Sequence, residues 1–249
     1  MHAASIDNGI YARPMPPPDA FGTLSIIGRQ QATITPTLRQ IELYTWEGLL
    51  SLHWHGSPTA RNVVVACGGA IGGTLGPGTA LYHQLGAHFG ADVDQDIGVI
   101  RVGYRRPNDL DACTLDVLAA ASLASRTGAE RFVVLGHSFG GAVAIQAGTL
   151  LGEYTAGVVT LATQSAGCEV GEKLAADGVP VLLLHGDNDD VLPFFASQLV
   201  QMLTGGELVI LPGASHGLSE VSEELRDRLL AWIPPQFSSP RRVRPEAPS

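Results

Sequence analysis

Ser138 is the residue of this sequence best placed to act as a nucleophile. It stands at the centre of the pentapeptide GHSFG at residues 136–140, between an apolar run at residues 131–135 and a stretch of small apolar residues at 141–147. This order predicts a strand, a sharp turn and a helix, and the glycines on either side permit the strained backbone that such a turn needs. The chemistry would be attack by the serine hydroxyl on a carbonyl carbon. The alternative is a glycine-rich turn whose serine only caps the helix.

A serine hydroxyl needs a base, because it is almost fully protonated near neutral pH. Of the eight histidines, His216 lies in a loop after the last predicted strand, at the sheet edge where active sites of α/β proteins assemble. The base needs a carboxylate that fixes its tautomer. The run HGDNDDVLP at residues 185–193 offers three acids, and Asp189 stands in a turn four residues past its histidine. We favour Asp189 and keep Asp187 and Asp190 as alternatives. Acids in such a turn are often only solvated or cap a helix.

The negative oxygen of a tetrahedral intermediate needs backbone amides that point at it in advance. Phe139, directly after the nucleophile, is expected to supply one of them. The other is expected from the loop CGGAIGG at residues 67–73, where four glycines permit a close backbone approach. We favour Gly69 as this donor, with Gly68 and Ala70 as alternatives. Such a loop can also cradle a phosphate, but neither GxxxxGK[ST] nor GxGxxG occurs, so a nucleotide site is not expected.

Strands and helices that alternate along the chain must position these residues. The strands predicted beyond Pro58 are short apolar runs, at residues 62–66, 97–103, 131–135, 157–161, 179–185 and 208–211. The helices predicted between them lie at residues 79–89, 110–126, 141–151, 194–203 and 219–232. Alternation of this kind predicts a mostly parallel sheet with helices on both faces. Before Pro58, residues 23–35, 38–46 and 49–55 predict antiparallel strands.

The two ends of the chain differ from the middle in composition. Residues 1–22 are proline-rich and predict an irregular arm, whereas residues 23–233 predict a single domain. Residues 234–249 combine prolines with arginines and predict a flexible tail.

Charge and cysteine content argue against several classes of partner and site. The formal net charge is −9 at pH 7, which disfavours binding to nucleic acid or to an anionic membrane surface. Cys67, Cys113 and Cys168 are widely spaced and include no C-x-x-C pair, so we expect reduced, structural thiols. The amino end lacks the pattern of a signal peptide and no segment is as long as a membrane-spanning helix, so a cytoplasmic location is expected.

With Ser138, Asp189 and His216 in this order, residues 38–232 resemble the α/β-hydrolase family, and among its members the serine esterases, lipases and dienelactone hydrolases without a large cap. The run that holds Asp189 is similar to the family's HGxxDxxxP segment, which supports Asp189 over its neighbours. The resemblance implies a three-layer α/β/α sandwich around a mostly parallel eight-stranded sheet whose second strand is antiparallel. Residues 23–35 would then form an extra strand.

Two features depart from the family pattern. Many relatives have His-Gly at the oxyanion loop where this chain has Cys67 and Gly68, which leaves the amide donor open. Relatives often insert a helical cap after the sixth strand, but residues 163–179 suffice here for only one helix. An open, shallow site is therefore expected. The residues expected to contact the substrate are Gly68, Ala70, Ile71, Tyr104, His137, Gln164 and Leu192.

The resemblance implies a serine hydrolase that cleaves a carboxylic ester or thioester. Ser138 would form an acyl-enzyme, His216 would transfer the proton, and Asp189 would orient His216. The implied substrate is a small-molecule ester or acyl compound, turned over without metal or organic cofactor by a monomer or homodimer. The alternatives are a thioesterase, peptidase or acyltransferase on the same triad, or a non-catalytic protein that binds a ligand on this fold.

Overall fold

One sheet of nine strands extends through residues 19–239, which are the residues that the computed structural model describes. The strands are β1 (Ile26–Thr35), β2 (Leu38–Thr45), β3 (Gly48–His55), β4 (Asn62–Cys67), β5 (Ile97–Gly103), β6 (Arg131–His137), β7 (Thr155–Leu161), β8 (Val181–Gly186) and β9 (Glu207–Leu211). Across the sheet their order is β1-β2-β3-β5-β4-β6-β7-β8-β9. The strands from β4 to β9 are parallel, whereas β3 is antiparallel to both of its neighbours.

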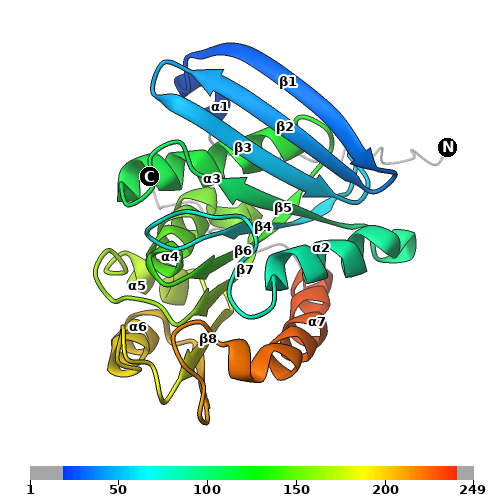
Figure 1. Cartoon of the computed structure of the whole chain (residues 1–249). Coiled ribbons are helices and arrows are strands. Elements are labelled where there is room, and N and C mark those ends of the chain that lie inside the picture. Colours follow the sequence, from blue (N-terminus) through cyan, green and yellow to red (C-terminus); the bar gives the residue numbers. More distant parts are fainter. Residues whose placement is uncertain (1–18, 240–249) are drawn as a thin grey trace, which may run out of the picture.

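Helices cover both faces of this sheet (Figure 1). They are α1 (Ala20–Thr23), α2 (Leu81–Ala91), α3 (Leu110–Ser125), α4 (Phe139–Leu151), α5 (Gly171–Ala176), α6 (Phe195–Thr204) and α7 (Ser222–Ser238). Helices α2 and α7 pack on one face, and the others lie on the opposite face. No helix between residues 19 and 239 is long and apolar enough to cross a membrane. The predicted three-layer sandwich is confirmed.

The apolar runs of the sequence become strands that are buried on both faces. In β4, Val63 and Val65 belong to the core beneath α3 and α4, whereas Val64 and Ala66 belong to the core beneath α2 and α7. A strand between two helical layers has no polar face, so its sequence is continuously apolar. The extra strand β1 has the opposite character, because it lies at the edge of the sheet and is exposed along most of its length. It corresponds to the extra strand predicted at residues 23–35, and with it the sheet has nine strands, one more than the eight that the resemblance implies.

The ends of the described chain differ from the predicted boundaries. Helix α7 does not end at Trp232 but continues through Pro234 and Pro235 to Ser238, so residues 234–238, predicted to be part of a flexible tail, are helical. A proline inside a helix removes one backbone hydrogen bond, but Arg131 supports this last turn by donating to two backbone carbonyls, those of Gln236 and Ser239.

At the amino end, the unpredicted helix α1 occupies part of the expected irregular arm, and its Ala20 packs in the core. The rest of that arm, residues 1–18, and residues 240–249 of the tail lie outside the described residues.

Candidate active site

Ser138 occupies the turn between β6 and α4 in a strained backbone conformation, with φ 57° and ψ −123°. Two glycines make this turn possible. A Cβ atom at Gly136 would overlap the carbonyl oxygen of Gly140, and a Cβ atom at Gly140 would overlap the carbonyl oxygen of Gly68. The strand, the helix and the loop after β4 therefore approach one another so closely that only glycine fits at these two positions. The serine between them lies half-buried at the carboxyl end of the sheet.

The structure brings Ser138, His216 and Asp189 into one hydrogen-bonded chain. Nε2 of His216 lies 3.0 Å from Oγ of Ser138, and its Nδ1 lies 2.7 Å from Oδ2 of Asp189. The three residues follow β6, β9 and β8, whose carboxyl ends share one edge because these strands are parallel. A carboxylate beside Nδ1 places the proton there, so the lone pair of Nε2 faces the serine hydroxyl. This arrangement is able to remove the hydroxyl proton during nucleophilic attack.

Asp189 differs in burial and in hydrogen-bond partners from Asp187 and Asp190, the two alternative acids. The side chain of Asp189 is fully buried, whereas Asp187 and Asp190 are exposed. Oδ1 of Asp187 accepts a hydrogen bond from the amide of Gly213, in the loop that leads to His216. Of the three acids, Asp189 alone lies within hydrogen-bond distance of the His216 ring among the described residues.

Asp189 is held by four hydrogen-bond donors. Oδ1 accepts from the amides of Val191 and Leu192 at 2.9 and 2.8 Å, and Oδ2 accepts from His185 at 3.1 Å as well as from His216. Burial by itself would raise the pKa of the Asp189 carboxyl, but the hydrogen bonds from Leu192, His216 and Val191 lower it below its ordinary value. The carboxylate therefore stays charged beside the His216 ring.

His185 supports the Asp189 carboxylate by a hydrogen bond, and the sequence had assigned His185 no catalytic role. Its buried Nε2 donates to Asp189 and to the carbonyl of Leu192, while its Nδ1 accepts from the hydroxyl of Ser197 at 2.6 Å. Since a carbonyl can only accept, the proton must reside on Nε2. Burial lowers the pKa of His185 and keeps it neutral. The spacing of four residues between His185 and Asp189 is the one sequence signal for this pair.

His137 lies against His216 on the other side of the proposed triad. Its Nε2 donates to the backbone carbonyl of His216 at 2.9 Å, and the two ring centroids are 4.9 Å apart. Burial lowers the pKa of His137 to about 4. His137 is therefore a neutral support for the His216 loop, whereas the sequence had suggested contact with the substrate.

The glycine-rich loop after β4 lies directly beside the serine. A Cβ atom at Gly69 would be only 3.5 Å from Cβ of Ser138. The hydroxyl of Tyr82 donates to the carbonyl of Cys67 at 2.9 Å, and the hydroxyl of Tyr104 donates to the carbonyl of Gly68 at 3.1 Å. The sequence predicted no role for Tyr82, because nothing in its sequence context marks it out.

The residues predicted to contact a substrate fall into two groups. Ile71 is 96% exposed, and Ala70, Gln164 and Leu192 are half-buried, as wall residues of an open site would be. Tyr104 is only 7% exposed and its hydroxyl is bonded to the loop, so it supports the site instead of lining it. Gly68 is buried in the same way.

The cysteines do not compete with Ser138 as nucleophiles. Cys67, Cys113 and Cys168 are all free and buried. Burial raises the pKa of each thiol to about 12, which keeps it protonated near neutral pH. No group of three or more His, Cys, Asp or Glu side chains within residues 19–239 is arranged to hold a metal ion.

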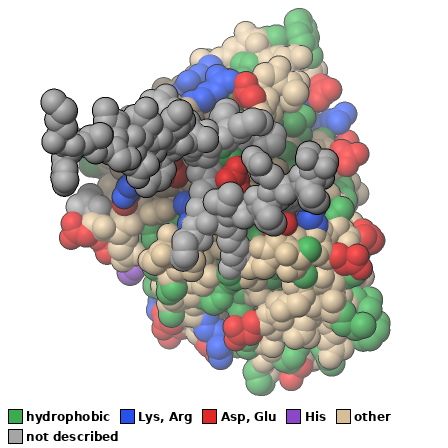
Figure 2. Space-filling model, turned by 180° about the vertical axis from the view of Figure 1, so that it is seen from behind, with side chains coloured by type: hydrophobic (Ala, Val, Ile, Leu, Met, Phe, Trp, Pro, Cys, Tyr) green, Lys and Arg blue, Asp and Glu red, His purple; other side chains and the backbone are tan. Residues whose placement is uncertain are grey.

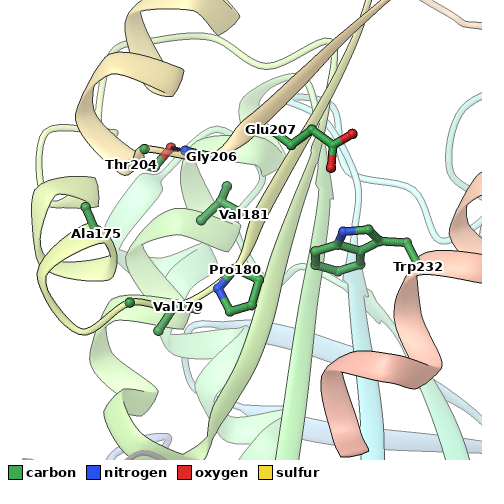
Figure 3. A pocket seen from close by; sticks show the side chains of 10 residues that line it. Ala175, Val179, Pro180, Val181, Thr204, Gly206, Glu207 and Trp232 are labelled. Atoms are coloured by element: carbon green, nitrogen blue, oxygen red, sulfur yellow. Dashed lines mark hydrogen bonds between the residues drawn. The ribbon is translucent and has the colours of Figure 1, made fainter. Parts of the chain in front are cut away.

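A cavity of about 370 Å³ lies at the opposite end of the parallel strands from Ser138, near their amino ends (Figure 3). It is lined by Val179, Pro180 and Val181 at the amino end of β8, by Glu207 at the start of β9, and by Trp232 of α7. Ser138 follows the carboxyl end of β6, which is parallel to these strands. The cavity is therefore separate from the candidate active site.

Part of the chain is similar to known proteins in sequence. Residues 112–227, slightly less than half of the chain, match the family model described as phospholipase/carboxylesterase. A segment of 65 residues is 38% identical to a bifunctional esterase/perhydrolase of Acinetobacter calcoaceticus, and another match is a non-heme chloroperoxidase of Burkholderia pyrrocinia, 37% identical over 65 residues. These matches cover 25% of this chain and 24% and 23% of those proteins, so they span about a quarter of the relatives' length.

Solved structures share most of this fold. Est1E of Butyrivibrio proteoclasticus is 14% identical with a TM-score of 0.66, over 80% of this chain and 99% of that one. An α/β serine hydrolase without a lid, from Xanthomonas campestris, is 17% identical with a TM-score of 0.62, over 82% of this chain and 98% of that one. The predicted resemblance is confirmed to this extent: part of the chain matches the family model, and the fold is that of the α/β-hydrolases.

Proposed function

We propose that this protein is a serine hydrolase that cleaves a carboxylic ester or thioester with Ser138, His216 and Asp189 as its catalytic triad. The observation that carries the proposal is the continuous chain of hydrogen bonds, 3.0 Å from the serine hydroxyl to His216 and 2.7 Å from His216 to a buried carboxylate. An unused serine beside a histidine would not need a strained backbone and a buried acid behind it.

In the proposed reaction Oγ of Ser138 attacks the carbonyl carbon while Nε2 of His216 takes the hydroxyl proton. The tetrahedral intermediate collapses, His216 gives the proton to the departing alcohol or thiol, and an acyl-enzyme remains. Water then attacks the acyl carbon, again with His216 as base, and the carboxylic acid and the free serine are released. The amides of Phe139 and Gly69 are the proposed donors to the negative oxygen.

The proposed substrate is a small ester or acyl compound that can enter an open site. Exposed apolar side chains, among them Ile71, Val191 and Phe195, surround the end of the sheet that carries Ser138. Only α5, a helix of six residues, lies between β7 and β8, where relatives often carry a cap. On the face shown in Figure 2, basic side chains are scattered among acidic ones, which does not favour nucleic acid. A cytoplasmic location and a monomer or homodimer complete the proposal.

Replacement of Ser138 by alanine tests the proposal. We expect S138A to lose about 10⁴- to 10⁶-fold in kcat on a short p-nitrophenyl ester, because the nucleophile is absent. S57A, which removes an exposed serine hydroxyl at the opposite edge of the sheet, is the control and should retain wild-type turnover. Turnover by S138A at the wild-type rate would refute the assignment. A wild-type protein that is folded but does not react with a fluorophosphonate would favour the ligand-binding alternative.

A further inference from the structure

The loop that approaches Ser138 has each of its first three carbonyls held in place. The Cys67 carbonyl accepts from Tyr82, the Gly68 carbonyl accepts from Tyr104, and the Gly69 carbonyl accepts from the amide of Gly72 at 2.9 Å. Successive peptide planes of the loop are therefore fixed one by one, although the loop consists largely of glycine, the residue that restricts the backbone least.

The direction of a carbonyl determines the direction of the next amide. In a trans peptide the C=O of one residue and the N–H of the following residue point in opposite directions, and the described chain contains no cis peptide. The Gly68 carbonyl points into the protein, where it meets the Tyr104 hydroxyl and the backbone of Gly140. The Gly69 amide must therefore point away from the Tyr104 hydroxyl, on the side of the loop where Gly69 pairs with Gly72 and lies against Ser138.

We propose that Tyr104 is a positioning residue for oxyanion stabilisation, because its hydroxyl keeps the Gly68–Gly69 peptide in the orientation that presents the Gly69 amide to the reacting oxygen. The inference rests on the proposed serine-hydrolase function. With glycine on both sides of this peptide, little steric resistance opposes a flip. A flipped peptide would present a carbonyl oxygen, which repels the negative charge that forms in the transition state.

Tyr82 provides a matched comparison for Tyr104. Both phenols are buried, both donate to a carbonyl of the same loop, and burial raises the pKa of both well above its ordinary value, so each remains a donor throughout the working pH range. They differ in the peptide that they hold. Tyr82 orients the Cys67–Gly68 peptide, one step farther from Ser138, so its loss should affect stability without turning the Gly69 amide.

The experiment compares Y104F with Y82F, each of which removes one buried hydroxyl and keeps the ring. For Y104F we expect kcat on a p-nitrophenyl ester, and the rate of Ser138 labelling by a fluorophosphonate, to fall about 10- to 100-fold, less than complete loss of an oxyanion donor. KM should stay within about threefold, since the amide acts mainly in the transition state. The pH profile of kcat should keep its shape, because His216 and Asp189 are untouched. Y82F should retain kcat within about threefold while its melting temperature falls as much as that of Y104F.

Three results would overturn the inference. Y104F could react at the wild-type rate, both variants could lose activity equally and in proportion to their loss of stability, or Y82F could lose more activity than Y104F, which would transfer the donor role to Gly68. If the wild-type protein itself fails to react with the fluorophosphonate, the proposed function falls together with the inference. If it reacts and Y104F reacts equally fast, the assignment of Tyr104 falls alone.

Discussion

At the scale of single residues, the candidate site contains one buried negative charge among three histidines. Asp189 holds its charge because the amides of Leu192 and Val191 and the ring of His216 offset the cost of burial. His137 and His185 are kept neutral by burial, so neither competes with His216 for a proton. In the proposed mechanism this arrangement directs the stabilising effect of the carboxylate to the imidazolium that forms on His216.

Replacement of Asp189 by asparagine tests this arrangement. An amide group beside Nδ1 of His216 can donate a hydrogen bond there, which favours the tautomer that carries its proton on Nε2 and cannot accept one from Ser138. We expect D189N to lose about 10³- to 10⁴-fold in kcat with KM little changed, measured on a p-nitrophenyl ester.

The exposed acids on either side of Asp189 are the controls for this change. D187N and D190N remove one charge from the same loop without touching His216, and both should keep kcat within about threefold. A loss in D187N or D190N as large as that in D189N would mean that the loop, and not the Asp189 carboxylate, accounts for the effect.

At the scale of elements, the turn between β6 and α4 and the loop after β4 are packed backbone against backbone. Gly140 lies in the first turn of α4 directly beneath the Gly68 carbonyl, the same carbonyl that Tyr104 holds. A backbone oxygen cannot swing aside as a flexible side chain can, so the helix and the loop must separate if this contact is crowded. The position of the proposed nucleophile relative to the Gly69 amide therefore depends on the absence of one side chain.

Replacement of Gly140 by alanine should disrupt both elements at once. We expect G140A to lose about 1–3 kcal/mol in the free energy of unfolding, as overpacked sites do, and to react with a fluorophosphonate at least about tenfold more slowly. G22A in α1 is the control, because the nearest atom to its added Cβ is 3.5 Å away. Urea denaturation and the labelling rate measure the two effects, and G140A behaving like G22A in both would contradict this account of the turn.

The alternation of elements was predictable from sequence, but some of their ends were not. The continuously apolar runs of β4 to β8 mark strands that are covered on both sides, and β5 and the start of α3 lie at the predicted residues. The end of α7 was predicted wrongly, because prolines normally end a helix and the carbonyl contacts of Arg131 are not visible in the sequence.

At the scale of the whole molecule, a further buried histidine, His55, lies between the sheet and α2, away from the candidate site. His55 is 2% exposed and accepts a hydrogen bond from Nε of Arg101 at 3.1 Å. Its pKa is lowered to about 3, first by burial and then by Arg101, His83 and His53, the charged and titratable groups around it. Because the folded protein resists protonation of His55 while the unfolded chain accepts it near pH 6.5, its contribution to stability is lost as pH falls below about 6.5.

Replacement of His55 by glutamine should make the protein less sensitive to acid. Glutamine retains an oxygen that can accept from Arg101 but has no group that takes up a proton. Between pH 7.5 and 5 the wild-type protein should lose about 2 kcal/mol more in the free energy of unfolding than H55Q, from about 1.5 pH units at 1.36 kcal/mol each. Urea denaturation at the two pH values measures this difference. H88Q, at an exposed position of α2, is the control, and equal pH dependence in H55Q and wild type would contradict the prediction.

The sequence by itself determined the order of strands and helices, because burial on one or both faces imposes a periodicity that can be read locally. It also identified Ser138, Asp189 and His216 as candidates, because a strained turn and a loop after a strand leave short, recognisable patterns. Only the tertiary structure decided which acid meets His216 and which side chains hold the loop beside Ser138. Those contacts, from Tyr104 to Gly68 and from His185 to Asp189, depend on the packing and register of separate elements, which local sequence patterns do not encode.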